Sequence, residues 1–172
     1  MGTVNAPREH APIAGQILLS GELTASDEQS LVAALAGCGV TAELRDMPPR
    51  RGAIEWLVLI ALPLQAFLTA LGTKGGESAY PQLIAAVRSI LRRHPADPGP
   101  ANPALAATPM PVLILQDPAT GVRIVLEGGL PDEAYRQLLT LDMSAFRLGP
   151  VHYDASKGRW RSELDEAAQR PS

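Results

Sequence analysis

The sequence contains one cysteine, few aromatic residues and only a small net charge. These shortages limit which kinds of protein it can be. Cys38 is the single cysteine among 172 residues, so no disulfide can form within the chain. Aromatic residues make up 4% and hydrophobic residues 46%, so the core must be built mainly from aliphatic side chains. The formal net charge of −3 argues against general nucleic-acid binding, which requires a basic surface.

Residues that could bind a metal ion are also scarce. The three histidines, His10, His94 and His152, stand apart from one another and from Cys38. A structural zinc site needs four ligands and a catalytic one usually needs three. Cys38 lies in the segment AGCGV, without a basic neighbour that would lower its pKa, and is interpreted as a small buried residue. The sequence therefore predicts no metal site and no cofactor.

The usual signatures of catalysis are incomplete. Residues 72–78, GTKGGES, suggest a phosphate-binding loop, but Lys74 precedes Gly75 and Gly76, whereas that motif places its lysine after the glycines. No G-x-S-x-G sequence marks a nucleophile. Adjacent carboxylates on a helix diverge by about 100°, so the pairs at 27–28 and 132–133 are interpreted as helix-terminus charges. No catalytic residue is assigned, and an enzyme of unrecognised type stays an alternative.

The first third of the chain has the pattern of a strand, a helix and a second strand. Residues 16–23 are apolar enough for a strand, and alternation over 40–45 predicts another strand with one buried face. Between them, Ser26 and Gln29 have the spacing of a capping box, which predicts that a helix begins at Ser26. Gly37 and Gly39 are typical of its end.

The middle of the chain holds an unusually apolar segment. Residues 56–73 are eighteen residues without a charge, interrupted by Pro63. We predict a long apolar helix over 53–71, kinked at Pro63 and buried in the core. Insertion into a membrane and contact with a second copy are the alternatives, because the segment is near the shortest length that spans a bilayer. Residues 80–93 predict an amphipathic helix, which would form a hairpin with the first.

The remaining segments complete the predicted fold. Residues 95–111 contain six prolines and no periodicity, which is typical of a linker. A hairpin over 112–127, a helix over 131–141 and a second hairpin over 151–162 follow. We predict an α+β fold with a single domain, whose mixed or antiparallel sheet has up to six strands covered by helices. The expected divisions are a disordered lead-in at 1–13, the first part at 14–94, the linker at 95–111, the second part at 112–162 and a tail at 163–172.

Two stretches carry a resemblance to a known family. LRDMPPRRGAIEWL at 44–57 joins a proline and arginine break to an apolar segment, and LIAAVRSILRR at 83–93 ends a helix with arginines. With the order of elements over 16–93 and 112–141, these stretches resemble the effector-associated constant component family of bacterial conflict systems. The resemblance implies a small α+β domain without catalytic residues that accompanies an effector protein. It carries over no functional residue.

Arginines provide the candidate site. Residues 45–94 hold seven basic and three acidic side chains, whereas the chain as a whole is acidic. If the two central helices form an antiparallel hairpin, their arginines cluster at one end, where they could bind an acidic partner. The candidate interaction patch comprises Arg50, Arg51, Arg88, Arg92 and Arg93.

The function favoured by the sequence is a non-enzymatic, cytoplasmic protein-interaction module in a bacterial defence or regulatory system. A protein partner is expected, a homo-oligomer is an option, and nucleic-acid binding is not expected. The alternative is a membrane-active or membrane-associated protein that uses residues 53–71.

Overall fold

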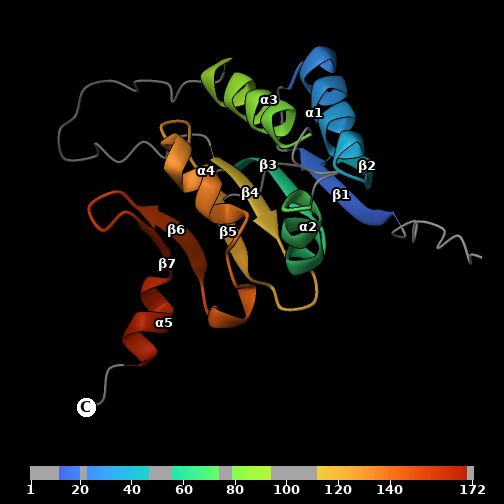
Figure 1. Ribbon diagram of the computed structural model, residues 1–172. Helices are drawn as coiled ribbons and strands as arrows, with labels where there is room; N and C mark the ends of the chain where they lie inside the picture. Colours follow the sequence, from blue (N-terminus) through green and yellow to red (C-terminus); the bar gives the residue numbers. More distant parts are fainter. Residues whose placement is uncertain (1–11, 20–22, 47–55, 74–78, 94–111, 170–172) are drawn as a thin grey trace, which may run out of the picture.

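The structure is a computed structural model that describes residues 12–19, 23–46, 56–73, 79–93 and 112–169. It is an α+β fold with a mixed seven-stranded sheet and five α-helices in the described residues (Figure 1). The strands are β1 (Ile13–Leu19), β2 (Val40–Asp46), β3 (Trp56–Ala61), β4 (Val112–Gln116), β5 (Arg123–Leu126), β6 (Pro150–Asp154) and β7 (Arg159–Arg161). The helices are α1 (Ala25–Gly37), α2 (Leu64–Leu71), α3 (Tyr80–Arg93), α4 (Asp132–Leu138) and α5 (Glu163–Ala168), with a 3₁₀ turn at Met143–Ala145.

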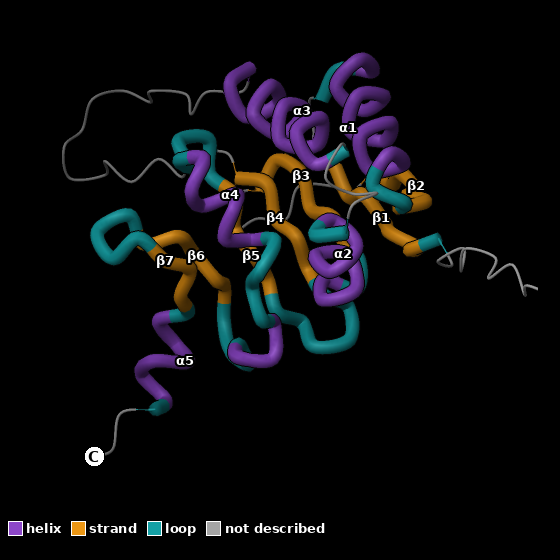
Figure 2. The backbone as a smooth tube through the Cα atoms, in the orientation of Figure 1, coloured by secondary structure: helices purple, strands orange, loops and turns teal. Residues whose placement is uncertain are grey.

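The sheet has the strand order β2-β1-β3-β4-β5-β6-β7, so only the start of the chain departs from sequence order. Three parallel pairs, β1 with β2, β3 with β4 and β5 with β6, lie side by side. Successive pairs meet antiparallel, at β1–β3 and at β4–β5, and β7 pairs antiparallel with β6. Each parallel pair is connected through a helical segment, as parallel strands require (Figure 2).

The main core lies between one face of the sheet and the helices. Strand residues at alternate positions, such as Ile17, Ile60 and Ile124, are 0% exposed and belong to the same cluster as the buried residues of α1 to α4. A second, smaller cluster on the other face is made by Leu59, Ile114 and Val125 with strand neighbours alone. Among the described residues, the helices therefore cover one face of the sheet.

The prediction of a long apolar helix over 53–71 is wrong. Residues 56–61 form β3 in the middle of the sheet, and α2 begins only at Leu64. Val58 and Ile60 of β3 are buried in the main core and Leu59 is buried in the smaller cluster on the other face, which explains why the sequence is apolar without alternation. Pro63 does not kink a helix but stands immediately before α2 as its N-cap residue. Residues 53–55 lie outside the described part of the chain.

The same segment accounts for two further corrections. The sheet has seven strands, one more than the upper limit expected, because the central apolar run supplies a strand. The expected hairpin of two long helices is absent from the described residues, where α3 instead packs beside α1. None of the helices in the described ranges is long and apolar enough to cross a membrane.

Several local expectations are confirmed and others need adjustment. The helix over 80–93 and the strand over 112–116 have the expected bounds. α1 begins at Ala25 and its N-cap is Thr24, whose hydroxyl oxygen accepts a hydrogen bond from the Asp27 amide at 3.2 Å, so the capping box at Ser26 is wrong. In the expected tail, residues 163–168 form α5. The expected linker at 95–111 lies outside the described residues, as does most of the lead-in at 1–13.

Candidate interaction surface

Three of the five predicted patch arginines can be located, all on α3. Arg88, Arg92 and Arg93 occupy its last turns, whereas Arg50 and Arg51 lie outside the described residues. The end of α3 lies beside the start of α1, not beside a helix formed by residues 53–71. The hairpin on which the predicted five-residue cluster was based is therefore not the arrangement observed.

Arg93 joins the end of α3 to the start of α1. Its guanidinium Nη1 lies 2.5 Å from Oδ1 of Asp27, whose side chain is 2% exposed, while the Arg93 side chain is 56% exposed. Thr24 also donates its hydroxyl to the Asp27 carboxylate at 2.8 Å. Asp27 lies in the first turn of α1 and Arg93 in the last turn of α3, so each charge also complements the helix dipole.

Arg88 connects α3 to α4 through contacts within the molecule. It forms an ion pair with Asp132 at the start of α4, and its guanidinium carbon lies 4.8 Å above the centroid of the Tyr135 ring. The hydrogen bond to Asp132 raises the pKa of Arg88, and the same hydrogen bond lowers the pKa of Asp132. These contacts hold α3 against α4. We therefore assign Arg88 a structural role and not a role in the exposed patch.

Arg92 is exposed at the end of α3. Among the described residues, its side chain hydrogen-bonds only to its own helix. Its Nε donates to the Arg88 carbonyl at 3.2 Å, and the side chain otherwise lies at the surface. Together with the exposed part of Arg93, it places positive charge at one end of the α1–α3 pair.

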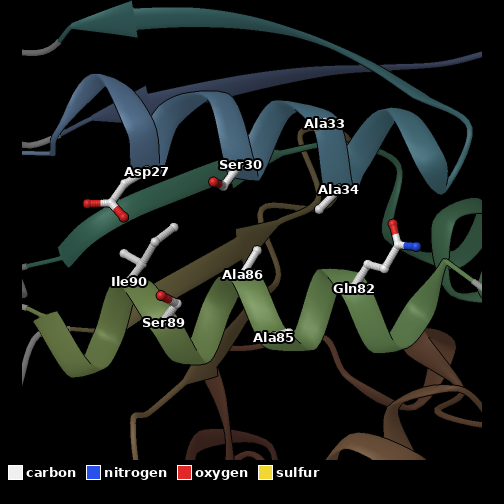
Figure 3. Close-up of a pocket in the computed structure, with 9 residues that line it drawn as sticks. All are labelled: Asp27, Ser30, Ala33, Ala34, Gln82, Ala85, Ala86, Ser89 and Ile90. Atoms are coloured by element: carbon white, nitrogen blue, oxygen red, sulfur yellow. The ribbon is translucent and has the colours of Figure 1, made fainter.

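A shallow groove of about 370 Å³ separates α1 and α3 (Figure 3). Its walls are made mostly of small side chains at helical spacing, and Asp27 and Gln82 lie toward opposite ends. The lining residues are Asp27, Ser30, Ala33, Ala34, Gln82, Ala85, Ala86, Ser89 and Ile90. Short side chains along the walls leave the groove open along both helices.

The side chains that line the groove are suited to packing and hydrogen bonding, and not to catalysis or metal binding. Of the described lining residues, Asp27 is the titratable one, and Arg93 and Thr24 already hold its carboxylate. Within the described residues, no three His, Cys, Asp or Glu side chains are grouped to hold a metal ion. Burial raises the pKa of Cys38 to about 11, so its thiol is protonated near neutral pH and is a poor nucleophile.

Sequence reasoning did not find the groove, although a signal was present. Ser30, Ala33 and Ala34 on α1 follow the i, i+3, i+4 spacing of one helix face, and on α3 Ser89 follows Ala86 by three positions and Ala85 by four. That spacing predicts a face of small residues on each helix. It does not reveal that the two faces border the same groove, because the packing of α1 on α3 is set by the sheet beneath them.

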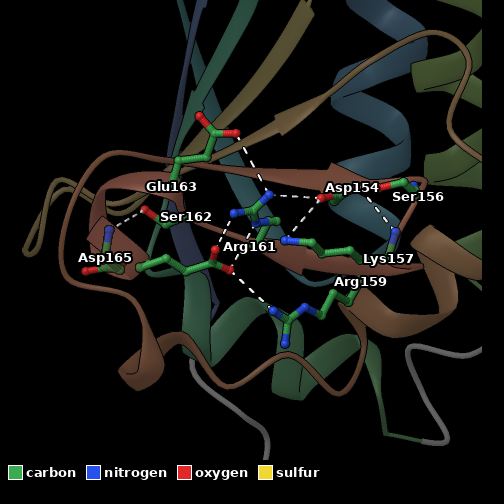
Figure 4. A network of polar contacts seen from close by, with 9 residues as sticks. Asp154, Ser156, Lys157, Arg159, Arg161, Ser162, Glu163 and Asp165 are labelled. Carbon is green, nitrogen blue, oxygen red and sulfur yellow. Dashed lines mark hydrogen bonds and ion pairs between the residues drawn. The ribbon is translucent and has the colours of Figure 1, made fainter. Parts of the chain in front are cut away.

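A separate polar network surrounds Arg161 in the C-terminal hairpin (Figure 4). Its guanidinium contacts Asp154 at 2.9 Å and pairs with Glu166 of α5, and its side chain is 17% exposed. Ser156 donates to Asp154 from both its hydroxyl and its amide. The network fixes the turn between β6 and β7 and attaches α5 to the hairpin.

The network predicts acid sensitivity. The Ser156 hydroxyl, followed by Arg161, lowers the pKa of Asp154 to about 2, against about 3.9 in an unfolded chain. A carboxyl whose pKa is lowered by folding stabilises the native state above the unfolded pKa. That contribution is lost as the pH falls from about 4 toward 2. In urea titrations from about pH 5 to pH 2, the difference in unfolding free energy between wild type and Asp154→Asn should shrink over this range.

Ser156→Ala provides the control for this pH dependence. Because it removes the largest contribution to the lowered pKa, the loss of stability on acidification should be smaller than in wild type and should be complete at a higher pH. A difference between wild type and Asp154→Asn that does not change with pH would contradict the assignment.

Comparisons with protein-family models, curated proteins and solved structures find no match to this chain. The function is therefore inferred from the surface described above.

Proposed function

We propose that the protein is a non-enzymatic interaction module of a bacterial defence or regulatory system, and that it binds an acidic segment of a partner protein along the α1–α3 groove. The observation that carries the proposal is the position of the groove, which has small side chains along its walls and exposed arginines at one end. The resemblance to effector-associated components supports the same class of function.

The chemistry of the groove identifies the kind of partner. A segment with small or apolar residues fits between Ala85 and Ala33, and carboxylates at its end would meet Arg92 and Arg93. Arginine forms paired hydrogen bonds with carboxylates, and these contacts would set the orientation of the segment. Since Arg92 lies at the surface, we expect binding to weaken as the salt concentration rises.

The test uses purified products of the genes adjacent to this one, titrated calorimetrically against variants. Ala85→Trp fills the groove and Arg92→Glu reverses the exposed charge, and each should weaken binding at least about tenfold, or 1.4 kcal/mol. Neither change removes a buried contact, since both side chains are exposed. The expected result is therefore a loss of affinity without a loss of folding.

Two matched variants control for nonspecific effects. Ala36→Trp adds the same bulk to an exposed alanine of α1 that does not line the groove, and Arg147→Glu reverses an exposed arginine elsewhere. Both should bind like wild type. If Ala85→Trp and Ala36→Trp bind a partner equally well, the groove is not its binding site.

A further inference from the structure

The two edges of the sheet differ in how well they are protected. β7 at one edge is three residues long and is followed at once by α5, and its Arg161 is held in ion pairs. β2 at the other edge is seven residues long and pairs with β1 without a register shift. Among the described residues, no strand pairs with its outer side. A long regular edge of this kind is a template for another strand.

The register shows which residues of β2 can bond outward. The Ile13 amide donates to the Gly39 carbonyl at 3.0 Å, and Ile13 is paired with Val40. In a parallel ladder, alternate residues of a strand bond to the same neighbour. The odd-numbered residues of β2 therefore bond to β1, and the amide and carbonyl groups of Ala42 and Leu44 point away from the sheet.

The side chains of β2 are self-complementary. Leu44 is on the same face as the buried Val40, yet it is 43% exposed. Glu43 and Arg45 flank it on the opposite face, with side chains 72% and 59% exposed and their charged atoms 3.7 Å apart. The edge thus presents one apolar side chain between two opposite charges.

We propose that β2 pairs with β2 of a second copy of the chain, antiparallel and about a two-fold axis at Leu44. In this register Leu44 lies opposite Leu44 of the second copy, and Glu43 lies opposite Arg45. The symmetry repeats the ion pair, so two Glu–Arg pairs flank the central leucines. The outward amide and carbonyl groups of Leu44 bond to their counterparts, and the two sheets become continuous.

The neighbouring registers are less favourable. Only registers that place even-numbered residues opposite each other align the free hydrogen-bonding groups. An axis at Glu43 sets that residue opposite itself, and an axis at Arg45 does the same for the arginine. Like charges directly opposite each other destabilise a strand pair. Any axis at a residue of β2 meets this hydrogen-bonding requirement, so it is charge that favours the axis at Leu44 over those at Glu43 and Arg45.

This interface is at the sheet edge and does not depend on the proposed partner groove. Because a single strand pair buries little surface, we expect a dissociation constant on the order of micromolar. The experiment requires no partner protein. Its failure would leave the groove proposal intact, and failure of the groove proposal would leave the dimer intact.

Sedimentation equilibrium of the full chain tests the dimer with a charge exchange. Glu43→Arg places arginines opposite each other twice in each dimer and should weaken association at least about tenfold. The double variant Glu43→Arg/Arg45→Glu restores both opposite-charge pairs and should regain most of the affinity. Circular dichroism should show the same fold in all three proteins, because both side chains are at the surface.

Cysteine crosslinking tests the register directly. Under mild oxidation, Leu44→Cys should form a disulfide-linked dimer, because the axis sets this position opposite itself. Thr41→Cys is exposed on the same strand but is not opposite itself, so it should remain largely uncrosslinked. A monomeric wild type would overturn the proposal. The proposal would also be overturned if Glu43→Arg left the dissociation constant of the dimer unchanged, or if the double variant did not recover the affinity of wild type.

Discussion

Replacing Leu62 by aspartate is expected to unfold the protein. Leu62 is 0% exposed and lies between β3 and α2, and its amide donates to the Gln116 carbonyl of β4 at 3.0 Å. A carboxylate at this position would be placed in the main core without a charged partner, at a cost of several kcal/mol. Because a domain is stable by about 5–15 kcal/mol in total, this change removes most or all of the stability.

Ala66→Asp is the matched control, since it introduces the same carboxylate into the same segment. Ala66 lies on the exposed side of α2, so its substitution should change the free energy of unfolding by less than about 1 kcal/mol. Circular dichroism with urea titration measures both variants. A Leu62→Asp protein that folds with near wild-type stability would show that this side chain is not in the core.

The elements that could be predicted from the sequence are those with a strong local signal. The helix over 80–93 alternates apolar and polar faces, and its bounds are confirmed. Gly121 and Gly158 adopt positive φ in the turns of the two hairpins, where residues with side chains would be strained. Turn chemistry and helix periodicity involve neighbours in sequence, so they can be recognised without knowledge of the packing.

The central apolar segment could not be assigned in this way. A continuous apolar run fits a buried strand as well as a buried helix, because periodicity is absent in both. Residues 56–71 combine a strand and a helix, and Pro63 marks their boundary. Treating the run as one element produced the wrong helix and, with it, the wrong neighbour for α3.

The candidate site shows the same limit. The arginines of α3 were recognised, but their partners depend on tertiary structure: Asp27 is 66 positions from Arg93, and Asp132 is 44 positions from Arg88. Asp27 was interpreted as a helix-terminus charge, which is correct, but its burial beneath Arg93 follows only from the packing of α1 on α3. Of the three located arginines, Arg88 therefore serves the fold, and Arg93 serves both the fold and the surface.

The second large effect is expected at Trp160, which attaches the C-terminal hairpin to the rest of the fold. Its side chain is 5% exposed, and its indole Nε1 donates to the Ala134 carbonyl of α4 at 2.9 Å. Its ring also meets Tyr153 edge-to-face, with centroids 5.6 Å apart. Trp160→Ala removes this packing and leaves a cavity, so it should cost about 3–5 kcal/mol.

Trp160→Phe separates packing from hydrogen bonding. It keeps most of the ring volume but removes the donor to Ala134, whose residue is 0% exposed, so it should cost about 1–2 kcal/mol. Urea titration gives the size of each loss, with the exposed neighbour Arg159→Ala as a control that should change little. Amide hydrogen exchange should show the loss of protection first in β6, β7 and α5, because Trp160 is the buried side chain of β7 that bonds to α4. Uniform loss of protection across the sheet, with α4 and β7 opening together with β1, would show that the hairpin is not a separate unit and that Trp160 supports the whole core.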